Sequence, residues 1–443
     1  MRIRVGTLRC FRRSFGLLSM EAPLQKRRAM PQLEPAYTLV VHCFLRLVGL
    51  EGGRCEQGII PAFAQGCESE NAKNGGRLMA APESDGPSYA QPEAIPPRAG
   101  ESLDLDVVAA YLRPRLPRTD GALSVEQFIG GRANLTYVLH FGARDYVLRR
   151  PPPPPVAPGA HDMAREYRVL SALHPVYPLA PRTYCFCEDE SILGVPFFVM
   201  ERCQGLVIRQ DMPPQYEHDL PLQRRMAEAL VDALVDLHAV DYCAIGLETL
   251  GRPEGFMARQ VAGWTRRWER AKPFETPAME EVTAWLHDHL PTSPPATLIH
   301  NDFKLDNTML DAADPGRLVA VFDWDMCTLG DPLADLGQLL CYWTEAQDHP
   351  DRYDAFPSPT VLPGFLTRDE VVQRYAERSG RDVTHIAFYH AYSLWRTATV
   401  VAQLFMLYQG GQSKDERLKH YDQRMLSFAS EALKVVRGTS YTT

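Results

Sequence analysis

Hydrophobic residues recur with two different periodicities along the chain, and each periodicity predicts a different kind of secondary structure. Between residues 123 and 148 apolar residues alternate with polar ones or form short runs, and glycines separate the runs. This pattern predicts an antiparallel meander of three strands, at residues 125–129, 135–141 and 146–148. Residues 196–202 (PFFVMER) are a further apolar run, which predicts a buried strand leading into a polar loop.

Longer segments carry apolar residues every three or four positions, as one buried face of a helix requires. Helices are predicted on this ground at residues 103–112, 161–173, 222–240, 386–407 and 414–437. Helix ends are also marked locally. Thr367 and Glu370 form a capping box that opens a helix, and Asp331 followed by Pro332 has the residues of a helix start.

Acidic side chains and one amide gather near residue 300, between two apolar runs. Residues 298–299 and 318–322 predict buried strands, and Asp302 and Asp323 follow their ends. Buried carboxylates are costly to ionise unless a cation or basic groups accompany them. Asn307, five residues after Asp302, supplies oxygen without adding charge. One carboxylate to orient a hydroxyl, with an amide and a carboxylate on Mg²⁺, meets the needs of phosphoryl transfer from ATP.

Other polar residues in this stretch have competing interpretations. Asp325 is either a second metal ligand or a turn residue, and Asp335 either braces the loop or faces solvent. His300 is interpreted as a structural histidine, because Asp302, two residues later, already supplies a carboxylate base. A lone Asp after a strand is most often a turn or cap residue, so the chemical interpretation depends on the spacing of the whole set.

Three motifs carry a resemblance to a known family. The segments HNDFKLDN, FDWD and GDPLADL, in this order between residues 300 and 336, resemble the catalytic and metal segments of aminoglycoside phosphotransferase-like kinases. The branch concerned is that of kinase-like domains related to those fused to acyl-CoA dehydrogenases. Asn301 is one departure, since the family usually has Gly there. The resemblance spans residues 103–437 and implies a protein-kinase-like, two-lobed α+β fold. A small antiparallel β N-lobe (residues 101–203) would precede a larger helical C-lobe (residues 204–443).

The resemblance also implies roles for the residues after the predicted strands. Asp302 would accept or orient the proton of the acceptor hydroxyl, and Lys304 would neutralise charge on the moving phosphoryl group. The candidate metal ligands are Asn307, Asp323 and Asp325.

Nucleotide binding is assigned by the same resemblance, with a structural alternative at each position. Gly130 and Gly131 would let backbone N–H groups approach the phosphates of ATP, although tight turns without ligands are common. Arg149 stands where kinases place a Lys, and its alternative is a solvated arginine at a strand end. Glu166 is placed to pair with Arg149, and its alternative is a surface residue of its helix. Arg can bind phosphate, but its geometry differs from that of Lys. Residues 196–202 would be the hinge, beside the adenine. The candidate nucleotide-binding residues are Gly130, Gly131, Arg149, Glu166, Met200, Glu201 and Cys203.

Composition limits the function classes. The 443 residues carry 47 Lys and Arg against 55 Asp and Glu, a net charge of −8, which argues against nucleic-acid binding. No apolar run is long enough to predict a membrane span, and ten Cys without metal-like spacing favour a reducing, cytoplasmic setting. Residues 1–100 change composition without periodicity, which predicts a disordered extension or a start assigned too far upstream. Five Arg and no acid in residues 1–20 would also suit an organelle presequence.

These observations predict an ATP- and Mg²⁺-dependent phosphotransferase acting on a hydroxyl of a small molecule. The branch resemblance favours a hydroxyacyl-CoA-type metabolite as acceptor. Arg266 and Arg267 are candidates for contact with an anionic group of such a substrate. The alternatives are a nucleotide-binding pseudokinase or scaffold, an aminoglycoside-type antibiotic kinase, and nucleotidyl transfer on the same fold. The oligomeric state is not predicted.

Overall fold

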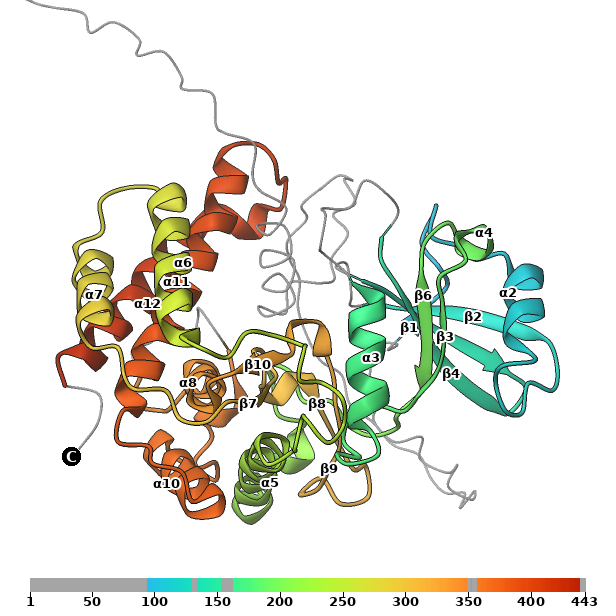
Figure 1. Cartoon of the computed structure of the whole chain (residues 1–443), viewed down its shortest axis with the longest axis horizontal. Helices are drawn as coiled ribbons and strands as arrows, with labels where there is room; N and C mark the ends of the chain where they lie inside the picture. The colour runs from blue at the N-terminus through green and yellow to red at the C-terminus, as the bar shows by residue number, and fades with distance from the viewer. Residues whose placement is uncertain (1–93, 130–133, 153–161, 349–351, 353–356, 439–443) are drawn as a thin grey trace, which may run out of the picture. The chain divides into compact units, whose positions relative to one another are not determined.

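The computed structural model describes residues 94–129, 134–152, 162–348, 352 and 357–438, which form an antiparallel sheet followed by a largely helical part (Figure 1). Gly130 and Gly131 lie outside the described residues, as do residues 1–93. The sheet includes Ala94 and Ile95, which precede the predicted start of the N-lobe at residue 101.

The sheet is the predicted meander, extended at both edges. Its six strands run in the order β1-β2-β3-β4-β6-β5, and each neighbouring pair is antiparallel. The strands are β1 (Ala94–Ile95), β2 (Leu123–Phe128), β3 (Leu135–Phe141), β4 (Arg144–Arg150), β5 (Thr183–Cys187) and β6 (Phe197–Glu201). A turn at Gly142, with φ of +55°, joins β3 to β4. A Cβ there would lie 2.9 Å from the carbonyl oxygen of Asp120, so the turn favours glycine.

Side chains that alternate along the strands bury both faces of the sheet. Leu148 and Phe197 face one core with α2 (Leu105–Leu112) and the single turn α4 (Glu190–Leu193). Val147 and Phe198 face the other core, which contains Met163 and Leu170 of α3 (Met163–Leu173) and continues into the helical part. The core on this side of the sheet is therefore continuous with that of the helical part.

After the sheet, the described residues contain seven helices of eight residues or more and two short antiparallel strand pairs. The helices are α5 (Leu220–His238), α6 (Phe256–Ala271), α7 (Pro277–Asp288), α8 (Pro332–Tyr342), α10 (Arg368–Ser379), α11 (Ile386–Gln409) and α12 (Tyr421–Val436). Helix α11 packs against α6, α7, α8 and α12 and is buried along most of its length. The α+β class predicted from the sequence is confirmed.

Helix ends show where local signals sufficed. The capping box at Thr367 and Glu370 is present, and Asp331 caps α8 with Pro332 at the first helical position. The helix predicted at residues 414–437 was too long. A 3₁₀ turn (Glu416–His420), capped by the Asp415 side chain, comes first, and α12 begins only at Tyr421.

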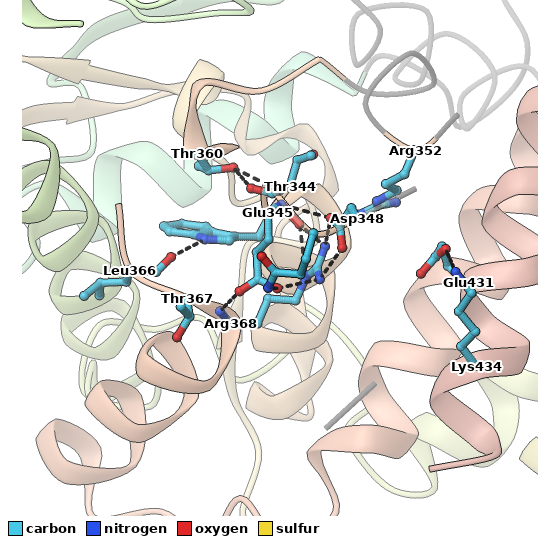
Figure 2. Close-up of polar contacts among 12 residues, drawn as sticks. Thr344, Glu345, Asp348, Arg352, Thr360, Leu366, Thr367, Arg368, Glu431 and Lys434 are labelled. Carbon is cyan, nitrogen blue, oxygen red and sulfur yellow. Dashed lines mark hydrogen bonds and ion pairs between the residues drawn. The ribbon is translucent and has the colours of Figure 1, made fainter. Parts of the chain in front are cut away.

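The chain after α8 is held by one arginine at the start of α10 (Figure 2). The guanidinium of Arg368 donates to Glu345 at 2.9 Å and to Asp348 at 2.8 Å, and it also donates to the carbonyl of Trp343. This network fixes the direction in which the chain leaves α8. No helix within the described ranges is long and apolar enough to cross a membrane.

Candidate active site

The loop that carries Asp302 begins at β7 (Thr297–Ile299), which pairs with β10 (Thr328–Gly330). The loop starts with a left-handed residue, Asn301, whose φ is +67°. Asn adopts this conformation more readily than most residues, and the Asn301 side chain donates to the Met326 carbonyl at 3.0 Å. The departure from the family's usual Gly is thus accommodated.

The side chain of Asp335, in α8, holds the start of this loop. Its carboxylate accepts hydrogen bonds from the backbone N–H groups of His300 at 2.5 Å and Asn301 at 2.6 Å. A third group, Nε2 of the buried His238 ring, lies 3.3 Å from Oδ2 of Asp335. Burial lowers the pKa of His238, and the ring accepts a hydrogen bond from the Tyr375 hydroxyl on its other nitrogen. Of the two alternatives for Asp335, the structure therefore has the bracing one.

His300 links the two polar loops. Its Nε2 lies 2.9 Å from the Phe322 carbonyl oxygen, and its Nδ1 lies 3.3 Å from the backbone N–H of Asp302. Because a carbonyl only accepts and an N–H only donates, the ring carries its proton on Nε2. Both nitrogens are engaged with backbone, as expected of a structural histidine.

The Asp302 carboxylate is held at both oxygens. Oδ1 accepts from the Tyr342 hydroxyl at 2.8 Å, and Oδ2 accepts from the Asn307 side-chain amide at 2.8 Å. The Lys304 ammonium lies 3.2 Å from Oδ2 and 3.7 Å from the carboxylate of Asp306. Asp302 is only 3% exposed. The carboxylate therefore has a defined direction.

Burial and charge act against each other at Lys304. Burial alone would lower the pKa of its ammonium, but the Asp302 and Asp306 carboxylates outweigh burial and raise the pKa. Burial raises the pKa of the Asp306 carboxyl to about 6. A protonated lysine next to Asp302 is the state that can neutralise developing negative charge.

The second polar loop follows β9 (Leu318–Val321), the partner strand of β8 (Thr308–Leu310). Asp323 has a φ of +69° and turns the chain into a 3₁₀ segment (Trp324–Met326). Its Oδ1 lies 3.1 Å from Nη2 of Arg149, whose Nε lies 3.1 Å from the Glu166 carboxylate. All three side chains are nearly inaccessible to solvent. One guanidinium therefore joins β4, α3 and the Asp323 loop.

Helix α3 contacts the same loop a second time. Arg165 donates to the backbone carbonyl of Asp325 at 3.0 Å and to that of Cys327. Asp325 is half-buried, and its backbone carbonyl is the acceptor for Arg165. Both of its interpretations stay open.

The residues predicted as a hinge follow β6. Met200 is buried and Glu201 is half-buried at the strand end, with the Glu201 backbone N–H donating to the Arg182 carbonyl at 2.8 Å. Burial raises the pKa of the Cys203 thiol to about 12, so it is a protonated thiol at neutral pH. Beyond it, Leu206 forms a two-way backbone bridge with Leu310, at 2.8 Å in both directions. The predicted hinge segment is thus joined by hydrogen bonds to the strand pair that follows Asn307.

The oxygen atoms that could bind a divalent cation come from two neighbouring segments. The backbone N–H of Phe322 donates to the Asn307 carbonyl at 2.8 Å, which joins the segment of Asn307 to that of Asp323. Amide and carboxylate oxygens are the ligands that Mg²⁺ prefers, and phosphate oxygens and water commonly complete its shell. No group of three Asp, Glu, His or Cys side chains suited to a metal occurs among residues the structure describes. Asn307 and Asp323 offer an amide and a carboxylate oxygen, so a Mg²⁺ held by them would need further ligands from a nucleotide and from water.

Tyr342 and Arg165 were not found by sequence reasoning. Tyr342 ends an almost wholly buried helix in which apolar residues predominate, and Arg165 resembles any surface arginine of an amphipathic helix. Neither position carries a local signal, because each acts on a loop that is distant in sequence.

A two-lobed fold with paired polar loops of this kind defines a class of phosphotransferases. The model of the phosphotransferase enzyme family matches residues 124–383. The chain belongs to this family.

Proteins of known sequence and structure resemble the chain over most of its described part. Acyl-CoA dehydrogenase family member 10 of Mus musculus is 31% identical over 73% of this chain and 30% of its own length. Acyl-CoA dehydrogenase family member 11 of Rattus norvegicus is 32% identical over 71% of this chain and 41% of its own length. The chain thus spans less than half the length of these relatives. A protein of Ralstonia eutropha, assigned as an aminoglycoside phosphotransferase, is 28% identical over 76% of this chain and 99% of its own, with a TM-score of 0.66.

Proposed function

We propose that the protein is a small-molecule kinase that uses ATP and Mg²⁺ to phosphorylate a hydroxyl group. The observation that carries the proposal is the Asp302 carboxylate, held at both oxygens and flanked by a protonated lysine. A carboxylate so oriented suits a base that receives the hydroxyl proton. The membership in a phosphotransferase family supports the same conclusion.

In the proposed reaction the acceptor oxygen forms a bond to the γ-phosphorus of ATP. The bond from this phosphorus to the bridging oxygen breaks, ADP leaves, and the hydroxyl proton passes to Asp302. Oδ1 accepts one hydrogen bond from the described residues, so a lone pair remains for the acceptor. Lys304 offsets the charge that develops on the transferred group.

Nucleotide and metal would be held by the loops around Arg149. Asn307 and Asp323 would bind Mg²⁺, with Asp325 as a further candidate, and the cation would neutralise charge on the phosphates. Arg149, aligned by Glu166, would contact the phosphates, and Gly130 and Gly131 would approach them by their backbone. Met200, Glu201 and Cys203 would line the adenine.

The acceptor that we favour is a hydroxyacyl-CoA-type metabolite. The relatives named as acyl-CoA dehydrogenases carry a matching segment, which supports this choice. An aminoglycoside acceptor is the second candidate, because the Ralstonia protein of similar fold is assigned to that activity. A nucleotide-binding pseudokinase is a third candidate function, because Arg149 stands where kinases have a Lys.

A ³¹P NMR screen tests the proposal. The protein is incubated with ATP, Mg²⁺ and separate hydroxyl compounds, among them hydroxyacyl-CoAs, amino alcohols, sugars and an aminoglycoside. We expect a new phosphomonoester signal with one class and none with Asp302→Asn. Asp288→Asn, at an exposed position, is the matched control. Nucleotide binding without any phosphorylated product would instead support the pseudokinase, and release of pyrophosphate would support nucleotidyl transfer.

A further inference from the structure

Two arginines from different helices meet on one buried tryptophan. The guanidinium carbon of Arg267, in α6, lies 4.4 Å from the ring centroid of Trp264, and that of Arg396, in α11, lies 5.5 Å from it. Trp264 is 3% exposed, so the ring is a fixed platform, and both arginines are half-buried. Stacking on an aromatic face fixes the orientation of a guanidinium.

Arg396 connects this arginine pair to the catalytic loop. Its Nη2 lies 3.5 Å from the backbone carbonyl oxygen of Asn301, the residue before Asp302. Arg396 also contributes to the electrostatic environment of Tyr342, whose hydroxyl donates to Asp302. The positive charge therefore lies close to the base that would receive the acceptor's proton.

No acidic side chain that the structure describes neutralises the charge of Arg396. Within the ranges that the structure describes, no carboxylate lies at ion-pair distance from Arg396, whereas Arg149 and Arg368 each contact two acidic side chains. Its polar neighbours are the Asn301 carbonyl and the hydroxyl of Tyr392, which is itself 3.3 Å from Gln260. Half-burying a cation without an anion costs free energy. An anionic ligand would recover this cost.

We propose that the acceptor carries an anionic group, a carboxylate or a phosphate, that binds to Arg396 and Arg267 while its hydroxyl lies at Asp302. The inference rests on the proposed kinase function and specifies its acceptor. A planar guanidinium binds either anion through two parallel hydrogen bonds. A polycationic acceptor such as an aminoglycoside would meet two like charges at this position. Arg266, the other sequence candidate, is exposed on the same helix.

Acceptors that differ only in charge test the inference. A hydroxy acid, its neutral amide and the amino alcohol of the same length are compared as phosphoryl acceptors, by release of ADP and by ³¹P NMR. The CoA thioester of the same hydroxy acid forms a further arm. Preference for the free acid identifies a carboxylate as the anion, and preference for the thioester identifies the carrier's phosphates.

The variants Arg396→Gln and Arg267→Gln are measured with the preferred anionic acceptor. We expect KM for this acceptor to rise roughly tenfold or more, since a charged hydrogen-bonded pair is lost, while kcat changes far less. Dissociation constants for ATP should be unchanged. Arg396→Lys should recover part of the loss, and Arg270→Gln, at an exposed position on α6, should behave like the parent. Arg396→Lys also covers the case in which Arg396→Gln fails to fold.

Each outcome decides a separate point. Equal use of charged and neutral acceptors, or preference for the amino alcohol, overturns the anionic acceptor while the kinase function stands. An unchanged KM for the acceptor in both Arg396→Gln and Arg267→Gln would also overturn the anionic acceptor and leave the kinase function in place. Absence of any Asp302-dependent phosphorylation overturns the kinase function, and the inference with it.

Discussion

The hydroxyl of Tyr342 donates a hydrogen bond to Oδ1 of Asp302, at 2.8 Å. The Tyr342 ring is buried at the end of α8, and the Lys304 ammonium lies 5.2 Å from its centroid. Burial raises the pKa of Tyr342 well above its ordinary value, so the hydroxyl stays protonated and remains a donor. Tyr342 is therefore a positioning residue for the candidate base.

Replacing Tyr342 by Phe removes this donor and keeps the ring. We expect kcat to fall about tenfold, because Asp302 loses one of the bonds that direct it, with little change in KM for ATP. The limb of the pH–rate profile that reports the base should shift as well, a change that mere loosening of the helix would not produce. Tyr408→Phe, whose hydroxyl bonds Glu416 at the surface, is the matched control. An unaltered kcat and pH profile would remove Tyr342 from the site.

Replacing Asp302 by Asn keeps the shape of the side chain and removes its basicity. General-base assistance contributes about 10² to 10⁴ in rate, so kcat should fall by this factor. ATP binding, measured by calorimetry, should stay within about threefold of the parent, because the loss falls on the transition state. A variant that turns over normally would show that another group accepts the proton.

Replacing Arg149 by Gln removes the guanidinium that contacts both Glu166 and Asp323. Loss of one partner from a buried ion pair costs about 3–5 kcal/mol, so the free energy of unfolding should fall by this order. Urea unfolding followed by tryptophan fluorescence measures it. Arg149→Lys should lose less of the free energy of unfolding, since it keeps the positive charge. It should still lose some, because an ammonium lacks the forked guanidinium that contacts two carboxylates. Arg437→Gln, from an exposed pair with Glu281, should change little. Equal stability of Arg149→Gln and the parent would contradict this account.

Asp348 makes stability depend on pH. Burial alone would raise the pKa of its carboxyl, but hydrogen bonding to Arg368 outweighs burial and lowers the pKa below the ordinary 3.8. An acid with a lower pKa in the folded state stabilises that state when ionised. Its contribution is complete above the unfolded pKa and disappears as the pH falls through the folded one.

The measurement compares the parent with Asp348→Asn. We expect the variant to be less stable by about 1–3 kcal/mol at neutral pH, where the charged hydrogen bonds are intact. The difference should shrink below about pH 4, as the parent's carboxyl becomes protonated. Asp120→Asn, at an exposed position, should show no such trend. A difference that is constant with pH would mean that Asp348 acts through its shape alone.

The sequence pattern was sufficient to predict those features that depend on residues close together in the chain. The strands at Leu135–Phe141, the capping box at Thr367 and the cap at Asp331 appear as predicted, because alternation, capping and turn chemistry act within a few residues. Asp302 and Asn307, five residues apart, lie in one short loop where the Asn307 amide donates to the Asp302 carboxylate, a contact that the sequence did not predict.

Contacts between distant segments were decided only by the tertiary structure. Tyr342 reaches Asp302 across 40 residues, Arg396 reaches Asn301 across 95, and Arg149 reaches Asp323 across 174. Whether such pairs meet depends on how helices and strands cross and on which rotamers their packing permits, and no local preference encodes this. The sequence by itself determined the main strands and helices and proposed the residues of the candidate site. Tertiary packing decided which side chains hold the candidate base, and which arginine has no carboxylate at ion-pair distance among the residues that the structure describes.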